Sequence, residues 1–314
     1  MTINTVEEIF LPSQDKKIPQ QNYFYGRKTM SNEKKKRMTL AEKWESLTFA
    51  DDFIFCRVLE KNLDVAKEIL ELLLDIQIDR VELSAAQKDC KTDYLSKGAR
   101  FDVYVKDGTG RCFDIEIQTS HLTDLAKRAR YYQGVMDVDN LMAGDDYKDL
   151  KDSYVIFLCM GDPFGLGLPV YTIRNRIDEA PSEVIDDGRL SVFYNARLYA
   201  KMKSQKLQAF FNYLSRQKSD SDLTDRLTKL VDRLKISPQE RKDYMTLSEM
   251  IQENREEGWA EGREEGKEEG KEEKAIETAK KMFNLKLSPQ QIAECTGLSL
   301  KKVMALQKEV CVTV

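Results

Sequence analysis

The sequence predicts an α/β fold in which a mixed central sheet is flanked by helices and followed by an all-helical C-terminal region. Helix-like and strand-like patterns alternate as far as residue 200. Residues 100–118 contain two short alternating segments joined by a glycine-bearing turn, and residues 153–160, SYVIFLCM, form an apolar run of strand length. Such a run is typical of a strand that is covered on both faces. From residue 203 onwards the apolar spacing is helical.

The α/β domain is expected over residues 38–200. Residues 1–37 are predicted to form a disordered basic tail ending in GRKTMSNEKKKR, either a solvated arm or a nonspecific contact to phosphate. Apolar residues then recur at helical spacing within residues 39–76, from Phe55 to Leu73, with Asp51 or Asp52 near the start. This pattern predicts one long amphipathic helix or two short ones. A short run, RVELSA, and a loop, CKTDYLSKGA, follow.

The second half of this domain is expected to alternate between helix and strand. Residues 123–142 predict a helix, with apolar residues on one side and the cations Lys127, Arg128 and Arg130 elsewhere. That apolar side carries Leu122, Leu125, Ala126, Ala129 and Tyr132. LPVYTI and LSVFYN are further expected strands. Helix, hairpin, helix and strand in this order indicate a sheet that mixes a hairpin with a crossover strand.

The C-terminal part is expected to contain three segments, of which residues 201–254 form a helical region. Ser237 and Pro238 give a helix start signal within it. Residues 255–274 carry a four-residue repeat with glycine at positions 258, 262, 266 and 270. The repeat suits a charged linker or marginal helix, because glycine lowers helix propensity. It also suits a coiled coil, which predicts a homo-oligomer formed through the C-terminal helices.

Residues 275–314 predict two short helices joined by a glycine-containing turn. Ser288 and Pro289 mark the first start, Gly297 lies in the turn, and Ser299 caps the second helix. This is the outline of a helix-turn-helix that contacts DNA, and any small helical hairpin has the same outline. Both interpretations stay open.

Composition narrows the chemistry. The net charge of −4 decides nothing about nucleic acid, because a basic groove can lie on an acidic chain. The six cysteines include no C-x-x-C pair, which fits neither a disulfide scaffold nor a zinc site and predicts a cytoplasmic protein. No apolar run approaches the roughly 18 residues of a membrane span, so no membrane partner is expected. His121 is the single histidine, so any chemistry is expected to depend on carboxylates.

The segment RFDVYVKDGTGRCFDIEIQ, residues 100–118, contains acids on both strands of the expected hairpin. Side chains alternate along a strand, so Phe101 is predicted to share a face with Val103 and Val105, while Asp102 lies on the other. A two- or four-residue loop would pair Asp102 with an isoleucine and turn acids toward the core. A three-residue loop, 108–110, places Asp102 directly opposite Glu116 and offers a glycine for the left-handed position.

Two facing carboxylates repel each other, and no structural need for this pair is evident. Mg²⁺ would resolve the repulsion, because it takes oxygen ligands and commonly binds through one or two carboxylates. A bound metal would also stabilise charge on a phosphate. The alternative is a solvent-facing hairpin whose acids only aid solubility.

Asp102 on one strand and Glu116 on the next resemble the core motif of the PD-(D/E)XK nuclease superfamily, which has an Asp followed by Glu-x-Lys on the next strand. More specifically, the chain resembles the Rpn family of recombination-promoting nucleases and transposases. The resemblance covers roughly residues 45–180 and is carried by DDFIFCRVLEKN, GARFDVYVKD, FDIEIQTS, KRARYYQGVMDVDNLMAGDDYKDLKDSYVIFLCMGDPFG and PVYTIRNRIDE. It implies a restriction-endonuclease-like mixed sheet with flanking helices.

The resemblance also implies the site residues. Asp102 and Glu116 would bind the metal with the backbone carbonyl of Ile117 as third ligand, and Gln118 stands where the superfamily has lysine. A glutamine can orient water or a phosphate oxygen but carries no charge. The implied accessory residues are Asp52, Glu60, Arg128, Tyr131 and Tyr132. Of these, Arg128 could supply the missing cation.

The function that the resemblance implies is that of an Mg²⁺-dependent DNA endonuclease, with Mn²⁺ as a substitute metal, in bacterial recombination, mobile elements or phage defence. The catalytic residues would be Asp102, Glu116 and Gln118. A first alternative is a nuclease-fold protein with weak or no catalysis, acting as a DNA-binding or assembly module. A second is a transposase with three acids, which gathers its acids from well-separated parts of the chain.

Overall fold

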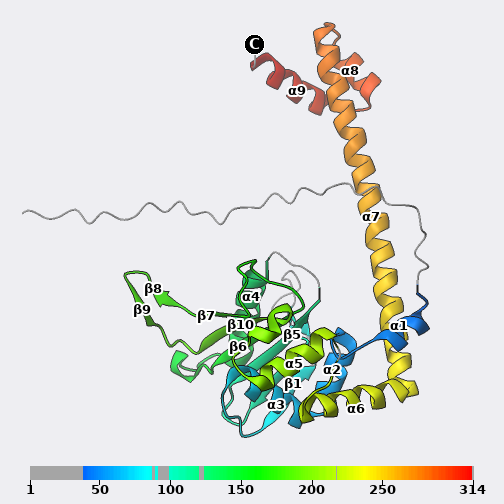
Figure 1. Ribbon diagram of the computed structural model, residues 1–314. Coiled ribbons are helices and arrows are strands. Elements are labelled where there is room, and N and C mark those ends of the chain that lie inside the picture. Colours follow the sequence, from blue (N-terminus) through cyan, green and yellow to red (C-terminus); the bar gives the residue numbers. More distant parts are fainter. Residues whose placement is uncertain (1–37, 87–88, 91–98, 120–123, 217, 313–314) are drawn as a thin grey trace, which may run out of the picture. The chain divides into compact units, whose positions relative to one another are not determined.

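The computed structural model describes residues 38–86, 89–90, 99–119, 124–216 and 218–312 (Figure 1). The predicted tail, residues 1–37, and His121 lie outside this part of the chain. The helices are α1 (Leu40–Ser46), α2 (Asp52–Lys61), α3 (Leu63–Leu74), α4 (Leu125–Asn140), α5 (Gln205–Arg216), α6 (Asp222–Ile236), α7 (Pro238–Asn284), α8 (Pro289–Thr296) and α9 (Leu300–Val312). Two 3-10 helices are η1 (Tyr147–Asp149) and η2 (Ala196–Lys201).

The central sheet has six strands in the order β1-β4-β5-β6-β10-β7. Their bounds are β1 (Val81–Ala86), β4 (Val103–Asp107), β5 (Cys112–Gln118), β6 (Ser153–Cys159), β7 (Val170–Ile173) and β10 (Arg189–Asn195). Strands β5, β6 and β10 run parallel, and the outer pairs are antiparallel. The sheet is therefore mixed, and helices flank it, which confirms the predicted fold class.

Both faces of the sheet are covered. One apolar core joins Val105, Phe113 and Ile156 to helices α2, α3, α5 and α6. A second core, on the opposite face, packs Tyr104 and Phe157 against α4. Strand β6 is accordingly buried on both sides, as its continuous apolar sequence predicts. The solvent-facing hairpin is therefore wrong, because α4 covers the face that carries the acids.

The predicted hairpin register is confirmed. Val103 pairs with Ile115 and Tyr104 with Asp114, so continuing the ladder by one residue sets Asp102 opposite Glu116. The Gly110 N–H donates to the carbonyl of Asp107 at 3.0 Å and closes the loop over residues 108–110. Gly110 has φ of +89°, the left-handed conformation that such a loop requires. The loop length thus fixes which side chains meet at the other end of the hairpin.

Gly110→Ala is expected to lower the free energy of unfolding by about 1–2 kcal/mol, because an L-residue is strained at positive φ. An added Cβ would also lie 3.3 Å from the Lys151 side chain. Gly108→Ala is the matched control, since Gly108 lacks a positive φ and its added Cβ would meet nothing closer than 3.5 Å. Urea unfolding of both variants measures the difference. Equal stability would contradict the left-handed turn.

Phe101 does not share a face with Val103 and Val105, so that prediction is wrong. Phe101 stacks on Tyr104 with ring centroids 5.0 Å apart and belongs to the core under α4. The alternation ends because the backbone bends at Asp102, before β4 begins. Ala126 was also expected on the apolar side of its helix but is exposed.

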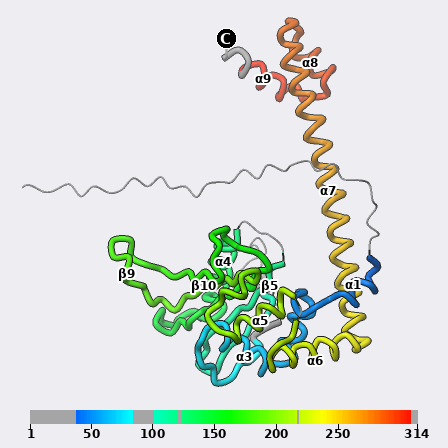
Figure 2. Tube along the Cα trace, viewed as in Figure 1, coloured from blue at the N-terminus to red at the C-terminus, as the bar shows by residue number. Residues whose placement is uncertain are grey.

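The stretch 39–76, predicted to form one long helix or two short ones, instead forms three, α1, α2 and α3, because the backbone leaves helical geometry at Leu47 and again at Asn62. Asp51 is the N-cap of α2, and Asn62 lies between α2 and α3 with φ of −137°, outside helical geometry. Ser237 caps α7, and Pro238 occupies its first turn, as predicted. Helix α7 then continues through residues 255–274 without interruption (Figure 2).

The glycine repeat is therefore helical in the structure. Within the described chain, a Cβ added at any of these four glycines would meet nothing within 4 Å. Helices α8 and α9 pack on the end of α7 through Ala279, Ile292 and Val303. Gly297 ends α8 with φ of +72°, which confirms the expected turn. The coiled coil, the homo-oligomer and DNA contact by this hairpin stay predictions.

A strand pair that the sequence patterns missed is β8 (Arg176–Ile177) with β9 (Ala180–Val184). Figure 2 shows this hairpin extending beyond the six-stranded sheet. It lacks a period-2 apolar pattern because β8 and most of β9 are exposed. Another two-stranded pair joins β2 (Asp89–Cys90) and β3 (Ala99–Arg100). No described helix is long and apolar enough to cross a membrane.

Candidate metal and nucleic-acid site

Asp102 is linked to Glu116 and to the adjacent Ile117 by two hydrogen bonds from backbone N–H groups. The Asp102 N–H donates to Glu116 Oε1 at 3.0 Å. The Ile117 N–H donates to Asp102 Oδ2 at 3.1 Å. These two hydrogen bonds orient both carboxylates at the open end of the β4–β5 hairpin. The two predicted acids are thus brought together.

Arg128 of α4 contacts this pair directly. Its Nη2 donates to Glu116 Oε2 at 2.5 Å, and its Nη1 donates to Gln118 Oε1 at 3.3 Å. Its Nε donates to the Tyr132 hydroxyl at 2.8 Å, and the guanidinium carbon lies 5.6 Å from the centroid of the Phe157 ring. The guanidinium therefore supplies a positive charge beside Gln118, where the motif usually has lysine.

Glu116 is only 1% exposed, and burial is the main reason why its pKa rises from 4.5 to about 8. The negative charges of Asp102 and Asp52 raise this pKa further, while Arg128 lowers it. Burying an ionised carboxylate beside other acids lowers the stability of the folded state. Such perturbed acids gather at functional sites.

Asp114 is a buried acid that the sequence interpretation did not single out. It is fully buried on the same face of β5 as Glu116, and neither carboxyl oxygen has a hydrogen-bond donor within the described residues. Burial, and then the charges of Glu116 and Asp102, raise the pKa of Asp114 well above its usual value. The alternation of β5 places Asp114 and Glu116 on one face, which was the available signal.

A cleft of about 480 Å³ opens beside Asp102 and Arg128, whereas Glu116 and Asp114 do not line it. Asp52, Asp102, Thr119 and Arg128 line its polar part. The remaining lining residues are Leu47, Asp51, Phe53, Tyr244, Leu247, Ser248 and Ile251. The first turns of α7 thus form one wall of the cleft, although they lie far from the motif in the sequence.

The five predicted accessory residues divide into two groups. Asp52 and Arg128 line the cleft, and Tyr132 contacts Arg128. Tyr131 is 38% exposed on α4. Glu60 does not line the cleft; it is the last residue but one of α2 and pairs with Arg57 at 3.4 Å.

The oxygen ligands at this site fit Mg²⁺ if water molecules complete its coordination. No group of three or more His, Cys, Asp or Glu side chains placed to hold a metal occurs in the described residues. Mg²⁺ commonly keeps several waters and binds through one or two carboxylates, which the Asp102 and Glu116 pair supplies. The unfavourable burial of Glu116 beside the charge of Asp102 is the observation that a cation would relieve.

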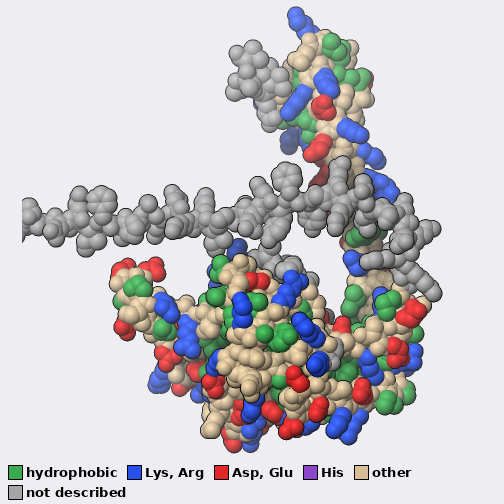
Figure 3. All heavy atoms as spheres, in the orientation of Figure 1, with side chains coloured by type: hydrophobic (Ala, Val, Ile, Leu, Met, Phe, Trp, Pro, Cys, Tyr) green, Lys and Arg blue, Asp and Glu red, His purple; other side chains and the backbone are tan. Residues whose placement is uncertain are grey.

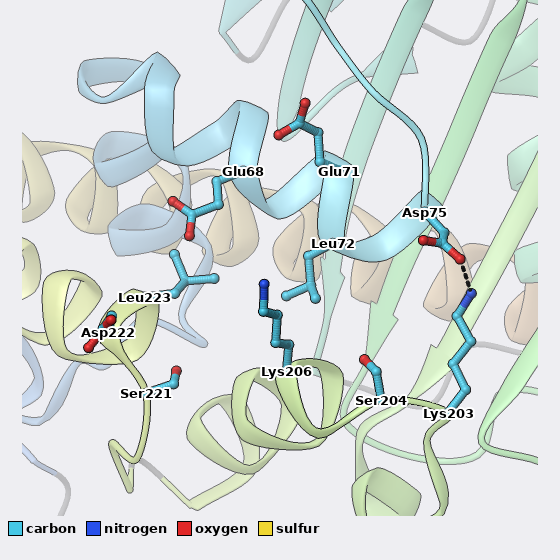
Figure 4. A pocket seen from close by; sticks show the side chains of 10 residues that line it. All are labelled: Glu68, Glu71, Leu72, Asp75, Lys203, Ser204, Lys206, Ser221, Asp222 and Leu223. Atoms are coloured by element: carbon cyan, nitrogen blue, oxygen red, sulfur yellow. Dashed lines mark hydrogen bonds and ion pairs between the residues drawn. The ribbon is translucent and has the colours of Figure 1, made fainter.

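A larger pocket of about 840 Å³ lies between α3 and the starts of α5 and α6 (Figure 4). It contains none of the predicted site residues. Figure 4 shows acids and lysines facing each other across it, and Lys203 pairs with Asp75 at 2.8 Å. Glu68 on its rim is paired with Arg226. Neighbouring charges of opposite sign thus compensate one another, so this pocket offers no distinct anion or metal site.

The surface charge in the view of Figure 3 is mixed, with Lys and Arg side chains interspersed among acids rather than gathered on one broad surface. A broad basic surface is therefore not the feature that locates nucleic acid on this face. The local arrangement of Asp102, Glu116 and Arg128 is the more specific feature.

Residues 49–165 match the family model of the PD-(D/E)XK nuclease family transposases. This segment is therefore similar to the PD-(D/E)XK nuclease family transposase domain. The match runs from the residues before α2 through β6 and includes the hairpin and α4. It confirms the resemblance to these nucleases and supports a nuclease- or transposase-like role. Neither a curated protein nor a solved structure matched the chain.

Proposed function

We propose that this protein is an Mg²⁺-dependent DNA endonuclease that hydrolyses phosphodiester bonds at the cleft beside Asp102. The observation that carries the proposal is the contact of Asp102 with the buried Glu116 and with the backbone of Ile117, to which the ion pair of Arg128 with Glu116 is added. The family match supports the reaction class. The contexts implied by the resemblance are recombination, mobile elements and phage defence.

Each residue has a stated role in the proposal. Asp102, Glu116 and the carbonyl of Ile117 would hold Mg²⁺, which supplies positive charge for the phosphate and lowers the pKa of a water molecule. Gln118 orients the attacking water by hydrogen bonding. Arg128 donates hydrogen bonds to the phosphate and offsets the charge that develops there. Water attacks phosphorus in line with the leaving oxygen, which departs with a proton.

In the metal-free state Arg128 is the cation that neutralises Glu116. In the proposed reaction this guanidinium turns from Glu116 toward the phosphate; Asp102 and Glu116 would hold Mg²⁺, whose charge would compensate these carboxylates. Its side chain is 29% exposed, so it borders the cleft and does not have to cross the core.

Metal removal tests the proposal. Supercoiled plasmid incubated with the protein in Mg²⁺ or Mn²⁺ is expected to be cut, and excess EDTA is expected to stop the reaction because the two carboxylates lose their cation. Gel electrophoresis of the plasmid measures the rate. Restored cutting after Mg²⁺ is added back controls for irreversible loss of the fold. Equal cutting in EDTA would contradict metal dependence.

A second candidate function is a nuclease-fold protein that binds DNA without cutting it. The favouring observation is that Gln118 replaces the usual lysine and its amide oxygen is held by Arg128. DNA binding by folded protein without any cutting in Mg²⁺ or Mn²⁺ would establish this function instead.

A further inference from the structure

The cleft beside Asp102 has two chemically different parts. Its polar part contains Asp102, Thr119 and Arg128. Its apolar part is formed by Leu47, Phe53, Tyr244, Leu247 and Ile251, contributed by α2, α7 and the turn after α1. A nucleotide offers two matching parts, a charged phosphate and an aromatic base whose flat faces stack on apolar side chains. The lining therefore matches one nucleotide unit better than a phosphate alone.

The apolar wall is held in place by aromatic packing. The Tyr244 ring lies 5.4 Å from the Trp44 ring and 5.4 Å from the Phe53 ring, centroid to centroid. Trp44 is fully buried, and Phe53 is 8% exposed. Tyr244 is thus fixed at the edge of the cleft, where an aromatic side chain can stack on a base of any sequence.

The acids in the lining do not disturb this match. Asp51 accepts hydrogen bonds from the Thr48 N–H at 2.7 Å and the Thr48 hydroxyl at 2.9 Å, so its carboxylate is engaged by the turn before α2. The negative charge of Asp52 raises the pKa of Glu116, so we group Asp52 with the residues near the proposed metal. The phosphate end and the base end of the cleft therefore stay separate.

A cleft of about 480 Å³ has the size of a small-ligand site, for which about 300–1,000 Å³ is typical. In a duplex, the bases beside the reacting phosphate are paired and stacked within the helix. Enzymes whose site encloses a base act on single strands or first extrude the nucleotide. Because α7 forms one wall of this cleft, the base of the nucleotide next to the reacting phosphate would likewise have to be unpaired to enter it.

We infer that the substrate is unpaired DNA, and that the start of α7 forms the surface on which the base next to the reacting phosphate stacks. This inference rests on the proposed function for the reaction but concerns the strand that the cleft accepts. Ser248 and Ile251 are the α7 residues whose side chains would contact this nucleotide, together with Tyr244. These three residues lie beyond the segment matched by the family model.

Binding tests the inference without any need for catalysis. A fluorescein-labelled oligonucleotide of about 20 nucleotides, single-stranded or in a duplex, is titrated with full-length protein in EDTA at one ionic strength. Fluorescence anisotropy is expected to show about tenfold tighter binding of the single strand, which corresponds to one stacked base. Equal or tighter binding of the duplex would overturn the inference.

Two matched pairs of variants locate the contact. Ser248→Trp fills the cleft, whereas Thr246→Trp places the same side chain at an exposed α7 position outside the lining. Ile251→Glu is paired with Met250→Glu, because both residues are 54% exposed and only Ile251 lines the cleft. The single-strand preference is expected to fall about tenfold in the first member of each pair and to persist in the second.

Circular dichroism and melting temperature test whether each variant folds. If Ser248→Trp does not fold, the Ile251→Glu and Met250→Glu pair provides the test. Loss of preference in both members of a pair would contradict a contact by α7. Cleavage in Mg²⁺ is measured separately on the same two substrates. Selective binding without cleavage would overturn the proposed hydrolysis and uphold the inference, whereas equal cleavage of both substrates would overturn the inference alone.

Discussion

Asp102→Asn and Glu116→Gln are each expected to lower the rate of plasmid cutting in Mg²⁺ by about a thousandfold, which corresponds to roughly 4 kcal/mol of transition-state stabilisation. Each change removes a negative oxygen from the proposed metal site while keeping an oxygen that can accept the backbone hydrogen bond. The plasmid assay described above measures the rate. Glu82→Gln is the control, because its side chain is 68% exposed on β1, away from the cleft lining.

Stability measurements separate a functional role of Glu116 from a structural one. Its pKa is raised from 4.5 to about 8 in the fold, so the folded state holds a proton that the unfolded state releases. The stability gained from this proton is present below the unfolded value and is lost as the pH rises toward about 8. Urea unfolding in EDTA is therefore expected to show metal-free protein losing stability between about pH 5 and pH 8.

Glu116→Gln cannot titrate, so its stability is expected to fall less over the same pH range, even though it no longer cuts DNA. Loss of activity together with a gain in stability at high pH is typical of a residue kept for function. A variant that is inactive and also less stable at every pH would point to a structural role instead. Undiminished cutting by both the Asp102 and the Glu116 variant would rule out the proposed metal site.

Arg128→Met is expected to reduce cutting about a hundredfold, because a donor and positive charge near the phosphate are removed. Adding Gln118→Lys to this variant is expected to recover part of the rate, since lysine restores a cation at the adjacent position. In the presence of Arg128, the same Gln118→Lys change is expected to bring little gain, because two cations would then compete for Glu116. Arg130→Met, at an exposed position of α4, is the control.

Arg128→Met also leaves the 1% exposed Glu116 without its ion pair, which is expected to cost about 3 kcal/mol of stability in metal-free protein at high pH. Combining it with Glu116→Gln removes this cost, so the two substitutions are not additive in urea unfolding. If the folded double variant Arg128→Met/Gln118→Lys cuts no faster than Arg128→Met alone, Arg128 does not replace the missing lysine. Additive stability changes would show that the ion pair contributes little.

The sequence predicted the hairpin well, because strand alternation and loop length are local properties. Asp102 opposite Glu116 follows from them, and so does a glycine at position 110. It could not predict that Phe101 changes faces, since that depends on the bend at Asp102 and on the ring of Tyr104 beneath α4. The same alternation placed Asp114 beside Glu116, but its complete burial depends on the helix that covers this face.

The wall formed by α7 was beyond sequence reasoning for a different physical reason. The spacing of residues 238–254 shows that they are helical but does not specify what they pack against. Tyr244 reaches the cleft because Trp44 and Phe53 hold it there. The ion pair of Arg57 with Glu240, at 3.4 Å, adds a second contact between α2 and α7. Such contacts join segments that are distant in the chain, and pattern periodicity carries no information about them.

The glycine repeat within α7 has a mechanical consequence. Each glycine weakens a helix by about 1 kcal/mol relative to alanine, and here four occur at every fourth position with no neighbouring side chain to support them. The compliant part of the helix thus lies between the end that lines the cleft and the end that carries α8 and α9. A force on α8 and α9 is therefore expected to bend α7 at the glycines before it disturbs the residues that line the cleft.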